Sequence, residues 1–296
     1  MRRARLAAVA GALVAGGLVV AAPAPARAQH CHVGMPDAPA GEGDDAHAHH
    51  DHDAHHDHRA HHAPPRPAPR RWWVAGATTM VAGSGSVGGV GRDYQGVALG
   101  VRGGWRRVSG RVSVPAFRVA DEGVGLGDVL TAVAADVVPG RGPWRAGVMG
   151  SASLPTGSSD AGRGMGHVMV AAGAWTRVRA GAARLDGAVV WARALGDGAE
   201  HAAHQHLAAM WPLVDPMNPE ELAVDASASA EVAPGLRAGA GATYAAPLSD
   251  GGAARVLAYA LAELGRGRQA YSVQLAVPAY GDPFVARATL EVAHRF

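Results

Sequence analysis

The residues best suited to chemistry in this chain are histidines crowded into one stretch near its start. Between His30 and Pro69, eleven histidines are interleaved with aspartates. Imidazole and carboxylate are ligands that borderline divalent ions prefer, and a polar stretch of this kind cannot bury a core. The alternative is a solvated low-complexity linker. We predict capture of Zn, Ni, Co or Cu by His47, His49, His50, His52, His55, His56, His58, His61 and His62.

A second group of histidines lies in the long segment Gly196–Glu221. His201, His204 and His206 are followed there by Met210 and Met217. In one helical turn, residues three apart share a face, so His201 and His204 can point the same way. A segment of this length without periodicity is typically functional or disordered. We predict a metal-contacting loop, with a plain surface loop as the alternative.

Catalytic motifs have little support in the sequence. The chain has no G-x-S-x-G elbow, no H-E-x-x-H and no Walker loop. Ser151 or Ser153 could face His167 across a hairpin, but a single histidine in a strand is far more often structural. We therefore expect no enzymatic activity and no organic cofactor.

Charged residues alternate with apolar ones in the last thirteen residues, Phe284–Phe296. One face carries Ala286, Leu290 and Val292, and the other carries Arg287 and Glu291. This period of two predicts a strand. The segment Leu222–Val232 repeats the pattern, with Asp225 and Glu231 on its polar face. In a transmembrane barrel the polar face lines the lumen, which predicts lumen-lining roles for Asp225, Glu231, Arg287 and Glu291; in a soluble barrel that face points to water.

About twelve runs of roughly ten residues follow Arg71, which is the length a tilted strand needs to cross a bilayer. The predicted runs are Trp72–Ala82, Tyr94–Trp105, Val108–Arg118, Gly127–Val138, Trp144–Leu154, His167–Val178, Ala183–Leu195, Leu222–Val232, Leu236–Pro247, Val256–Leu264, Ala270–Ala279 and Phe284–Phe296. This predicts an all-β fold, an antiparallel up-and-down transmembrane barrel.

The joins between these runs alternate in length. Short joins such as Arg106-Arg107 alternate with longer ones such as Gly83–Asp93 and Pro155–Gly166. Such alternation is typical of an outer-membrane barrel with both termini in the periplasm. Aromatic residues near the run ends predict interfacial girdles, with ordinary core positions as the alternative for each: Trp72, Trp73, Trp105, Trp144, Trp175, Trp191, Tyr271 and Tyr280.

The chain divides into three parts by composition. Residues 1–28 have the basic start, apolar run and Ala26-Arg27-Ala28 cleavage site of a secretory signal peptide. Residues 29–71 form the tract rich in His, Asp and Pro, and residues 72–296 form the predicted barrel. A formal charge of +2 gives no support for a nucleic-acid partner, and the single cysteine, Cys31, excludes an internal disulfide.

Two short motifs carry a resemblance to a known family. Gly125-Leu-Gly-Asp128 and Ser153-Leu-Pro-Thr-Gly157 resemble segments of the outer-membrane proteins grouped under the meta-pathway of phenol degradation. The resemblance covers roughly Trp72–Phe296 and implies a channel or transporter-like barrel. The histidine-rich tract is outside that pattern and points toward metals.

These observations together predict a protein of the outer membrane of a Gram-negative-type bacterium, with its N-terminal tract in the periplasm. Its partners would be outer-membrane lipid and either metal ions or another small solute. We expect the barrel to bind or pass that solute, with divalent transition metals as the favoured class. The alternatives are a channel for small hydrophobic or aromatic compounds and a soluble periplasmic metal-binding barrel.

Overall fold

The structure is a computed structural model that describes residues 72–87, 90–120, 123–138, 142–158, 161, 163–195, 218–249, 252–281 and 284–296. The predicted signal peptide, the histidine-rich tract and the group His201, His204 and His206 lie outside the described residues. Among the residues that are described, no helix is long and apolar enough to cross a membrane.

Strands make up nearly all of the described chain. They are β1 (Trp72–Val87), β2 (Val90–Trp105), β3 (Val108–Val119), β4 (Gly123–Leu126), β5 (Val129–Val138), β6 (Trp144–Leu154), β7 (Val168–Ala180), β8 (Ala183–Leu195), β9 (Glu220–Ala233), β10 (Leu236–Pro247), β11 (Arg255–Arg266), β12 (Gln269–Tyr280) and β13 (Phe284–Arg295).

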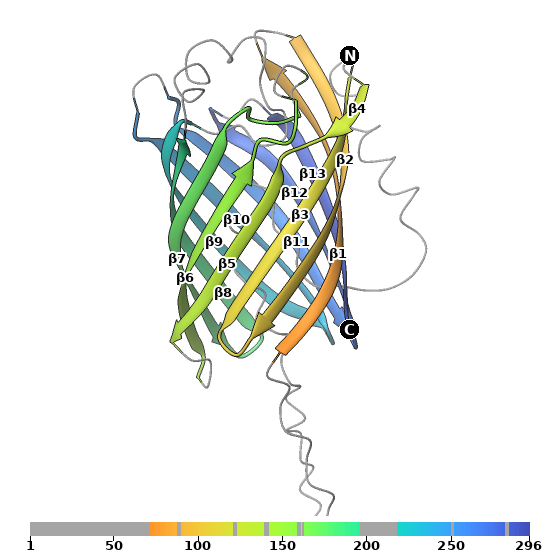
Figure 1. Cartoon of the computed structure of the whole chain (residues 1–296). Coiled ribbons are helices and arrows are strands. Elements are labelled where there is room, and N and C mark those ends of the chain that lie inside the picture. Colours follow the sequence, from red (N-terminus) through yellow and green to blue (C-terminus); the bar gives the residue numbers. More distant parts are fainter. Residues whose placement is uncertain are drawn as a thin grey trace, which may run out of the picture.

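The strands form one closed antiparallel sheet (Figure 1). Each long strand pairs with its neighbours in sequence, and β1 pairs with both β2 and β13, which closes the ring. The short strand β4 stands outside this ring of twelve and pairs only with the end of β3. Because closure removes unpaired edges, every long strand has a partner on both sides. The predicted twelve-stranded up-and-down barrel is confirmed.

The prediction of a long join at Gly83–Asp93 is wrong. Strands β1 and β2 continue along this segment until Val87 pairs with Val90. The glycine- and serine-rich sequence has no apolar alternation, but the backbone ladder of a hairpin does not require one. The segment between the predicted runs Val108–Arg118 and Gly127–Val138 contains the short strand β4.

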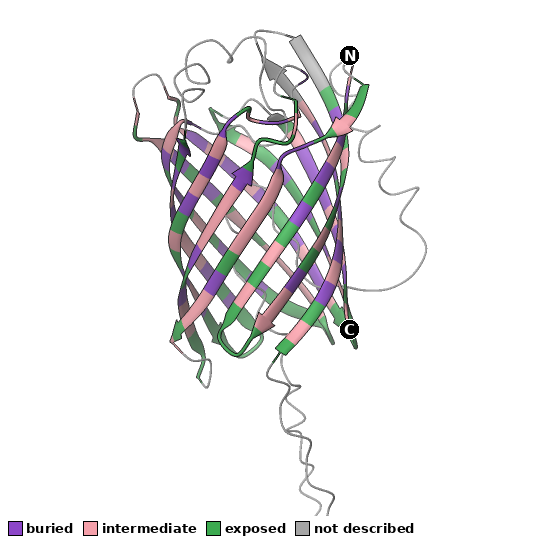
Figure 2. Ribbon diagram, in the orientation of Figure 1, coloured by how far each residue is buried: buried purple, intermediate pink, exposed green. Residues whose placement is uncertain are grey.

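Burial alternates along the strands and separates the two faces of the barrel (Figure 2). A single closed sheet can cover side chains only on its inside, so the buried positions point inward. On β13, Arg287, Thr289 and Glu291 are at most 4% exposed. On β12, Val273, Leu275 and Val277 are 43–54% exposed and point outward. The outer surface is therefore apolar, and the inner one is largely polar.

Aromatic residues occupy both faces of this wall. Trp72, Trp105, Trp144 and Tyr280 are 50–67% exposed near strand ends, as interfacial residues would be. Trp175 is only 3% exposed, so its prediction as a girdle residue is wrong. It sits on the inward face of β7, two residues from the equally inward Arg177.

Candidate functional site

The inner wall near the short turns carries a band of ion pairs. Nine residues from eight strands take part, and we call them the basal belt: Arg102, Arg111, Asp136, Arg145, Arg177, Arg184, Asp186, Glu263 and Glu291. Buried charges are stable only when paired or hydrogen-bonded. Arginines and carboxylates are both present in the basal belt, so each of these charges has an oppositely charged partner.

Glu291 is the most connected carboxylate of the basal belt. It pairs with Arg102 and lies 3.5 Å from Arg111, and Thr79 donates a hydrogen bond of 3.2 Å to it. These partners come from β2, β3 and β1, so this single side chain on β13 spans the closure of the barrel. The Arg111 side chain is 29% exposed and remains the more accessible cation.

A second group of ion pairs in the basal belt lies on the side of the barrel opposite Glu291. Asp186 on β8 accepts from Arg177 at 2.6 Å and is 2.8 Å from Arg184. Arg184 also pairs with Glu263 on β11, two strands beyond its neighbour β9. Contacts between strands that are not hydrogen-bonded neighbours are possible only through the interior, which confirms where these side chains point.

Another polar cluster lies at the other end of β9 and β11. Glu221 is fully buried, and one of its oxygens accepts from Arg255 at 2.6 Å and from the Asn218 amide at 2.9 Å. Nearer the middle, Asp225 accepts from Thr243 at 2.8 Å and from Tyr259 at 3.0 Å. The polar lining therefore continues along β9–β11 from one end of the barrel toward the other.

The four residues predicted to line the lumen occupy different surroundings. Glu291 and Arg287 are buried on the inward face of β13, and Asp225 is partly buried in its hydrogen-bonded cluster. Glu231 is exposed near the short turn after β9, where it accepts from the Gly235 amide at 3.2 Å. Arg255, Glu263 and Glu221 were missed, although each alternates with apolar neighbours in the printed sequence.

The histidines predicted to bind metal lie outside the described residues, so their arrangement stays a prediction. Within the described part of the chain, no group of three or more His, Cys, Asp and Glu residues is placed to hold a metal. His167 is buried just before β7, and its Nε2 lies 3.2 Å from the Met169 sulfur.

The join between β6 and β7 is held by one carboxylate. Asp128 accepts from the backbone amides of Gly157 at 2.9 Å and Met165 at 2.7 Å. Burial raises the pKa of Asp128, while the hydrogen bonds from Met165, Gly157 and Ser153 oppose that rise. A side chain at Gly157 would meet the Arg163 carbonyl oxygen at 2.6 Å. The two motifs behind the family resemblance therefore meet in space as a structural clamp.

Inward aromatic rings lie directly over glycines of the neighbouring strand. Trp175 faces Gly147, and a Cβ added to that glycine would come within 2.7 Å of the ring. Four more cross-strand pairs repeat this arrangement: Trp73 with Gly104, Tyr94 with Gly83, Phe117 with Gly96 and Tyr259 with Gly241. Such pairing covers exposed glycine backbone and keeps each ring flat against the wall. The sequence shows it only once strand register is known.

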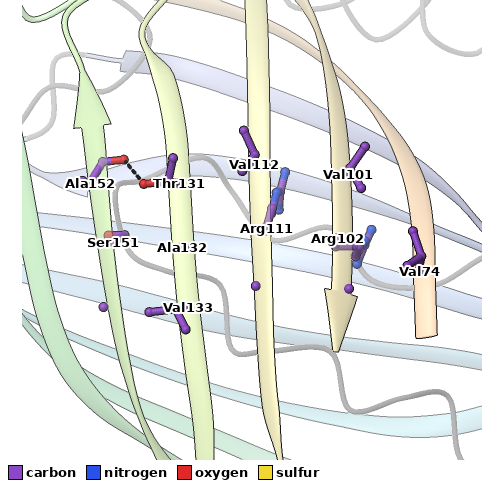
Figure 3. A pocket seen from close by; sticks show the side chains of 13 residues that line it. Val74, Val101, Arg102, Arg111, Val112, Thr131, Ala132, Val133, Ser151 and Ala152 are labelled. Carbon is purple, nitrogen blue, oxygen red and sulfur yellow. Dashed lines mark hydrogen bonds between the residues drawn. The ribbon is translucent and has the colours of Figure 1, made fainter. Parts of the chain in front are cut away.

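One hollow of about 580 Å³ opens on the outer face across β1–β6 (Figure 3). Its rim is formed by Val101, Val112 and Val133, which point outward, and its floor includes Gly103 and Gly110. The Thr131 hydroxyl on this face donates to the Ala152 carbonyl at 3.2 Å (Figure 3). Arg102 and Arg111 of the basal belt line the hollow as well, so this largely apolar depression in the outer wall reaches the backs of two inward cations.

Comparison with solved structures identifies similar barrels. An outer-membrane channel from Pseudomonas putida F1 matches with a TM-score of 0.57 and 14% sequence identity, over 79% of this chain and 100% of that one. The chain shares the fold of that channel. The NanC porin matches at 7% identity over 74% of this chain and 97% of that one, with a TM-score of 0.47.

The similarity is one of architecture. No protein-family model matches the chain, and no curated protein matches it. The resemblance to the meta-pathway family accordingly rests on the two motifs alone. At 14% identity the likeness to the channel shows a shared fold alone.

Proposed function

We propose that this chain spans the outer membrane and passes a small polar solute through its interior. The observation that carries the proposal is that the outer face of the barrel is apolar and the inner face is charged. Apolar side chains face out all around a closed sheet, and paired charges face in. In water this arrangement would expose the apolar face and is unfavourable, whereas in a bilayer it satisfies both faces.

The ends of the strands support one orientation in the membrane. Strand β1 starts and β13 ends at the end with short turns, where Trp72 pairs with Trp105 (Figure 1). Barrels of the outer membranes of Gram-negative-type bacteria have short turns on the periplasmic side. The basal belt would then lie near the periplasmic mouth, and the histidine-rich tract would enter the barrel wall from the periplasm.

Divalent transition metals are the favoured class of solute. The sequence supports this preference for metals, because imidazole and carboxylate groups of residues 29–71 would raise the local metal concentration beside the periplasmic mouth. The basal belt supports passage of a hydrated, charged species, since paired charges offer both donors and acceptors along the wall.

Small hydrophobic or aromatic compounds are the second candidate. The observation in their favour is an apolar strip on the inner wall, where Met149, Met169, Trp175 and Val190 cluster on β6–β8. Such a strip gives an apolar compound a surface to follow, beside the polar lining of β9–β11. The two candidates use different parts of the same interior and can be separated by flux measurements.

Reconstitution of the mature chain in liposomes tests the proposal. A zinc-sensitive dye inside the vesicles and a set of small aromatic acids and neutral aromatics outside give the two flux readouts. We expect protein-dependent zinc entry, increased by Arg111→Glu, which replaces a cation of the inner wall by a carboxylate, and left unchanged by Arg107→Glu in the exposed turn before it.

The outcomes separate the candidates. Aromatic flux without zinc flux would favour the second candidate, and the histidine-rich tract would then be incidental. Absence of any protein-dependent flux, together with solubility of the mature chain without detergent, would overturn the proposal in favour of a soluble metal-binding barrel.

A further inference from the structure

A buried imidazole and a buried thioether meet where the inner wall joins the loop before β7. His167 and Met169 are 5% and 1% exposed, and Nε2 of His167 lies 3.2 Å from Sδ of Met169. Met169 belongs to an apolar cluster that also contains Met149, and the partly buried Met165 packs against this cluster. Neither the polar lining nor the basal belt uses these residues.

The ring of His167 has one proton for two acceptors. Burial lowers the pKa of His167, and a hydrogen bond with the Met165 backbone opposes that shift. A hydrogen bond that raises a histidine pKa is one in which the ring donates, and a neutral ring has a single N–H. The carbonyl is a stronger acceptor than a thioether sulfur. A thioether has no proton to give, so with the ring proton on the nitrogen remote from Met169, Nε2 and Sδ face each other as two lone-pair donors 3.2 Å apart.

We propose that His167 and Met169, assisted by Met165, form a binding site for a soft monovalent cation, Cu(I) or its analogue Ag(I). Imidazole combined with thioether is a donor set that favours copper over hard divalent ions. The gap of 3.2 Å between Nε2 and Sδ is of the size that one ion can bridge: bonds as long as those of zinc, about 2.0 Å to nitrogen and 2.3 Å to sulfur, would meet at roughly a right angle.

The supporting contacts hold the three residues in place without occupying the site. Both oxygens of Asp128 accept backbone amides, and one of those amides is that of Met165. The carboxylate is therefore committed to the loop and fixes where Met165 and His167 stand. A hydrogen-bonded outer shell of this kind orients ligands in established metal sites. The site does not depend on the proposed passage of solute, because its donors belong to the wall.

Methionine methyl resonances provide the test. The full mature chain is labelled with ¹³C-methyl methionine, placed in detergent micelles in chloride-free buffer and titrated with Ag(I) nitrate. Ions held by the histidine-rich tract do not move the Met169 signal, so this readout is specific. We expect the Met169 methyl to shift as Ag(I) is raised until the histidine-rich tract and the wall site are both saturated, whereas Zn(II) over the same concentrations leaves it in place.

The variants decide between a site and a plain hydrogen bond. His167→Asn should weaken Ag(I) binding at Met169 by more than about 100-fold, beyond the roughly 10- to 100-fold that loss of an outer-shell partner costs. Met80→Leu, on the outer face of β1, should change nothing. If His167→Asn does not fold, the volume-conserving Met169→Leu replaces it, and Ag(I) must then lose its effect on the His167 ring signals.

Three results would overturn the proposal. They are a Met169 methyl that ignores saturating Ag(I), a shift that persists unchanged in the tested variant, and an equal response to Zn(II). The first two would leave His167 as a donor of an N–H···S hydrogen bond. The third would remove the preference for soft ions.

Discussion

At the scale of single residues, Glu291 is the carboxylate of the basal belt with the most polar partners. It is 1% exposed and faces the guanidinium groups of Arg102 and Arg111. We predict that Glu291→Gln lowers the free energy of unfolding by about 3–5 kcal/mol, because it leaves buried cations without a counter-charge. Urea unfolding in lipid vesicles measures this change.

The matched control for that substitution is Glu231→Gln. Glu231 is exposed near a turn and accepts one backbone amide, so a change within about 0.5 kcal/mol is expected. Equal effects of the two substitutions would contradict the special role given to Glu291.

Asp128 makes stability depend on pH in a defined direction. Its pKa is raised in the folded state above its ordinary value of 3.8, mainly by burial. The folded state therefore binds the proton of the Asp128 carboxyl more tightly than the unfolded state does. The contribution of Asp128 to stability falls as pH rises from 3.8 to the higher pKa of the folded state. We predict that the stability of the unsubstituted chain relative to Asp128→Asn decreases as pH rises above 3.8 and then levels off. Paired unfolding curves at several pH values measure this, and an increase would contradict it.

At the scale of strands, pairing of aromatic rings with glycines fixes the inner wall. A Cβ on Gly147 would lie 2.2 Å from the Ala135 carbonyl oxygen and 2.7 Å from the Trp175 ring. We predict that Gly147→Ala displaces Trp175, alters its near-ultraviolet circular dichroism and costs about 1–3 kcal/mol, the range for overpacking. Gly150→Ala on the same strand meets only an ordinary contact of 3.5 Å and should be tolerated.

Outward positions of the strands should report the depth of the bilayer. Leu275 is 54% exposed in the middle of β12, while Val232 is 60% exposed near the short turn after β9. We predict that Leu275→Arg costs about 2–4 kcal/mol in vesicles and Val232→Arg about 0–1 kcal/mol. Unfolding in lipid vesicles measures both costs. Similar costs at the two positions would argue against a membrane around the outer face of the barrel.

Much of the strand pattern could be read from the sequence. The segments Trp144–Leu154, Ala183–Leu195 and Leu236–Pro247 were predicted with the bounds that the structure has, because alternation there is flanked by turn residues. The ends of β1 and β2 were missed because Gly83–Val87 has no apolar alternation, yet its backbone pairs with Val90–Tyr94.

The interior was less predictable than the strands. Alternation identified Glu291 and Arg287 as polar-face residues, but partners such as Arg102 and Glu291 are 189 residues apart in sequence. Their meeting depends on how the sheet closes and on the relative register of three strands. The contact of His167 with Met169 was missed as well, because alternation alone does not show where the ring and the sulfur meet.

At the scale of the whole molecule, the two faces of the barrel define what the chain can do. The closed sheet places an apolar surface outside and a lining of ion pairs, hydrogen bonds and an apolar strip inside. That arrangement supports a membrane-spanning wall around a solute path. Metal binding by the histidine-rich tract and by His201, His204 and His206 stays a prediction, because these residues lie outside the described part of the chain.

Membrane fractionation of the mature protein, followed by gel electrophoresis with and without boiling, tests the membrane-spanning barrel most directly. A closed barrel in the outer membrane should sediment with that membrane and migrate differently when unboiled, because its sheet survives the detergent until heated. Recovery of the protein in the soluble periplasmic fraction, with identical migration of boiled and unboiled samples, would contradict a membrane-spanning barrel.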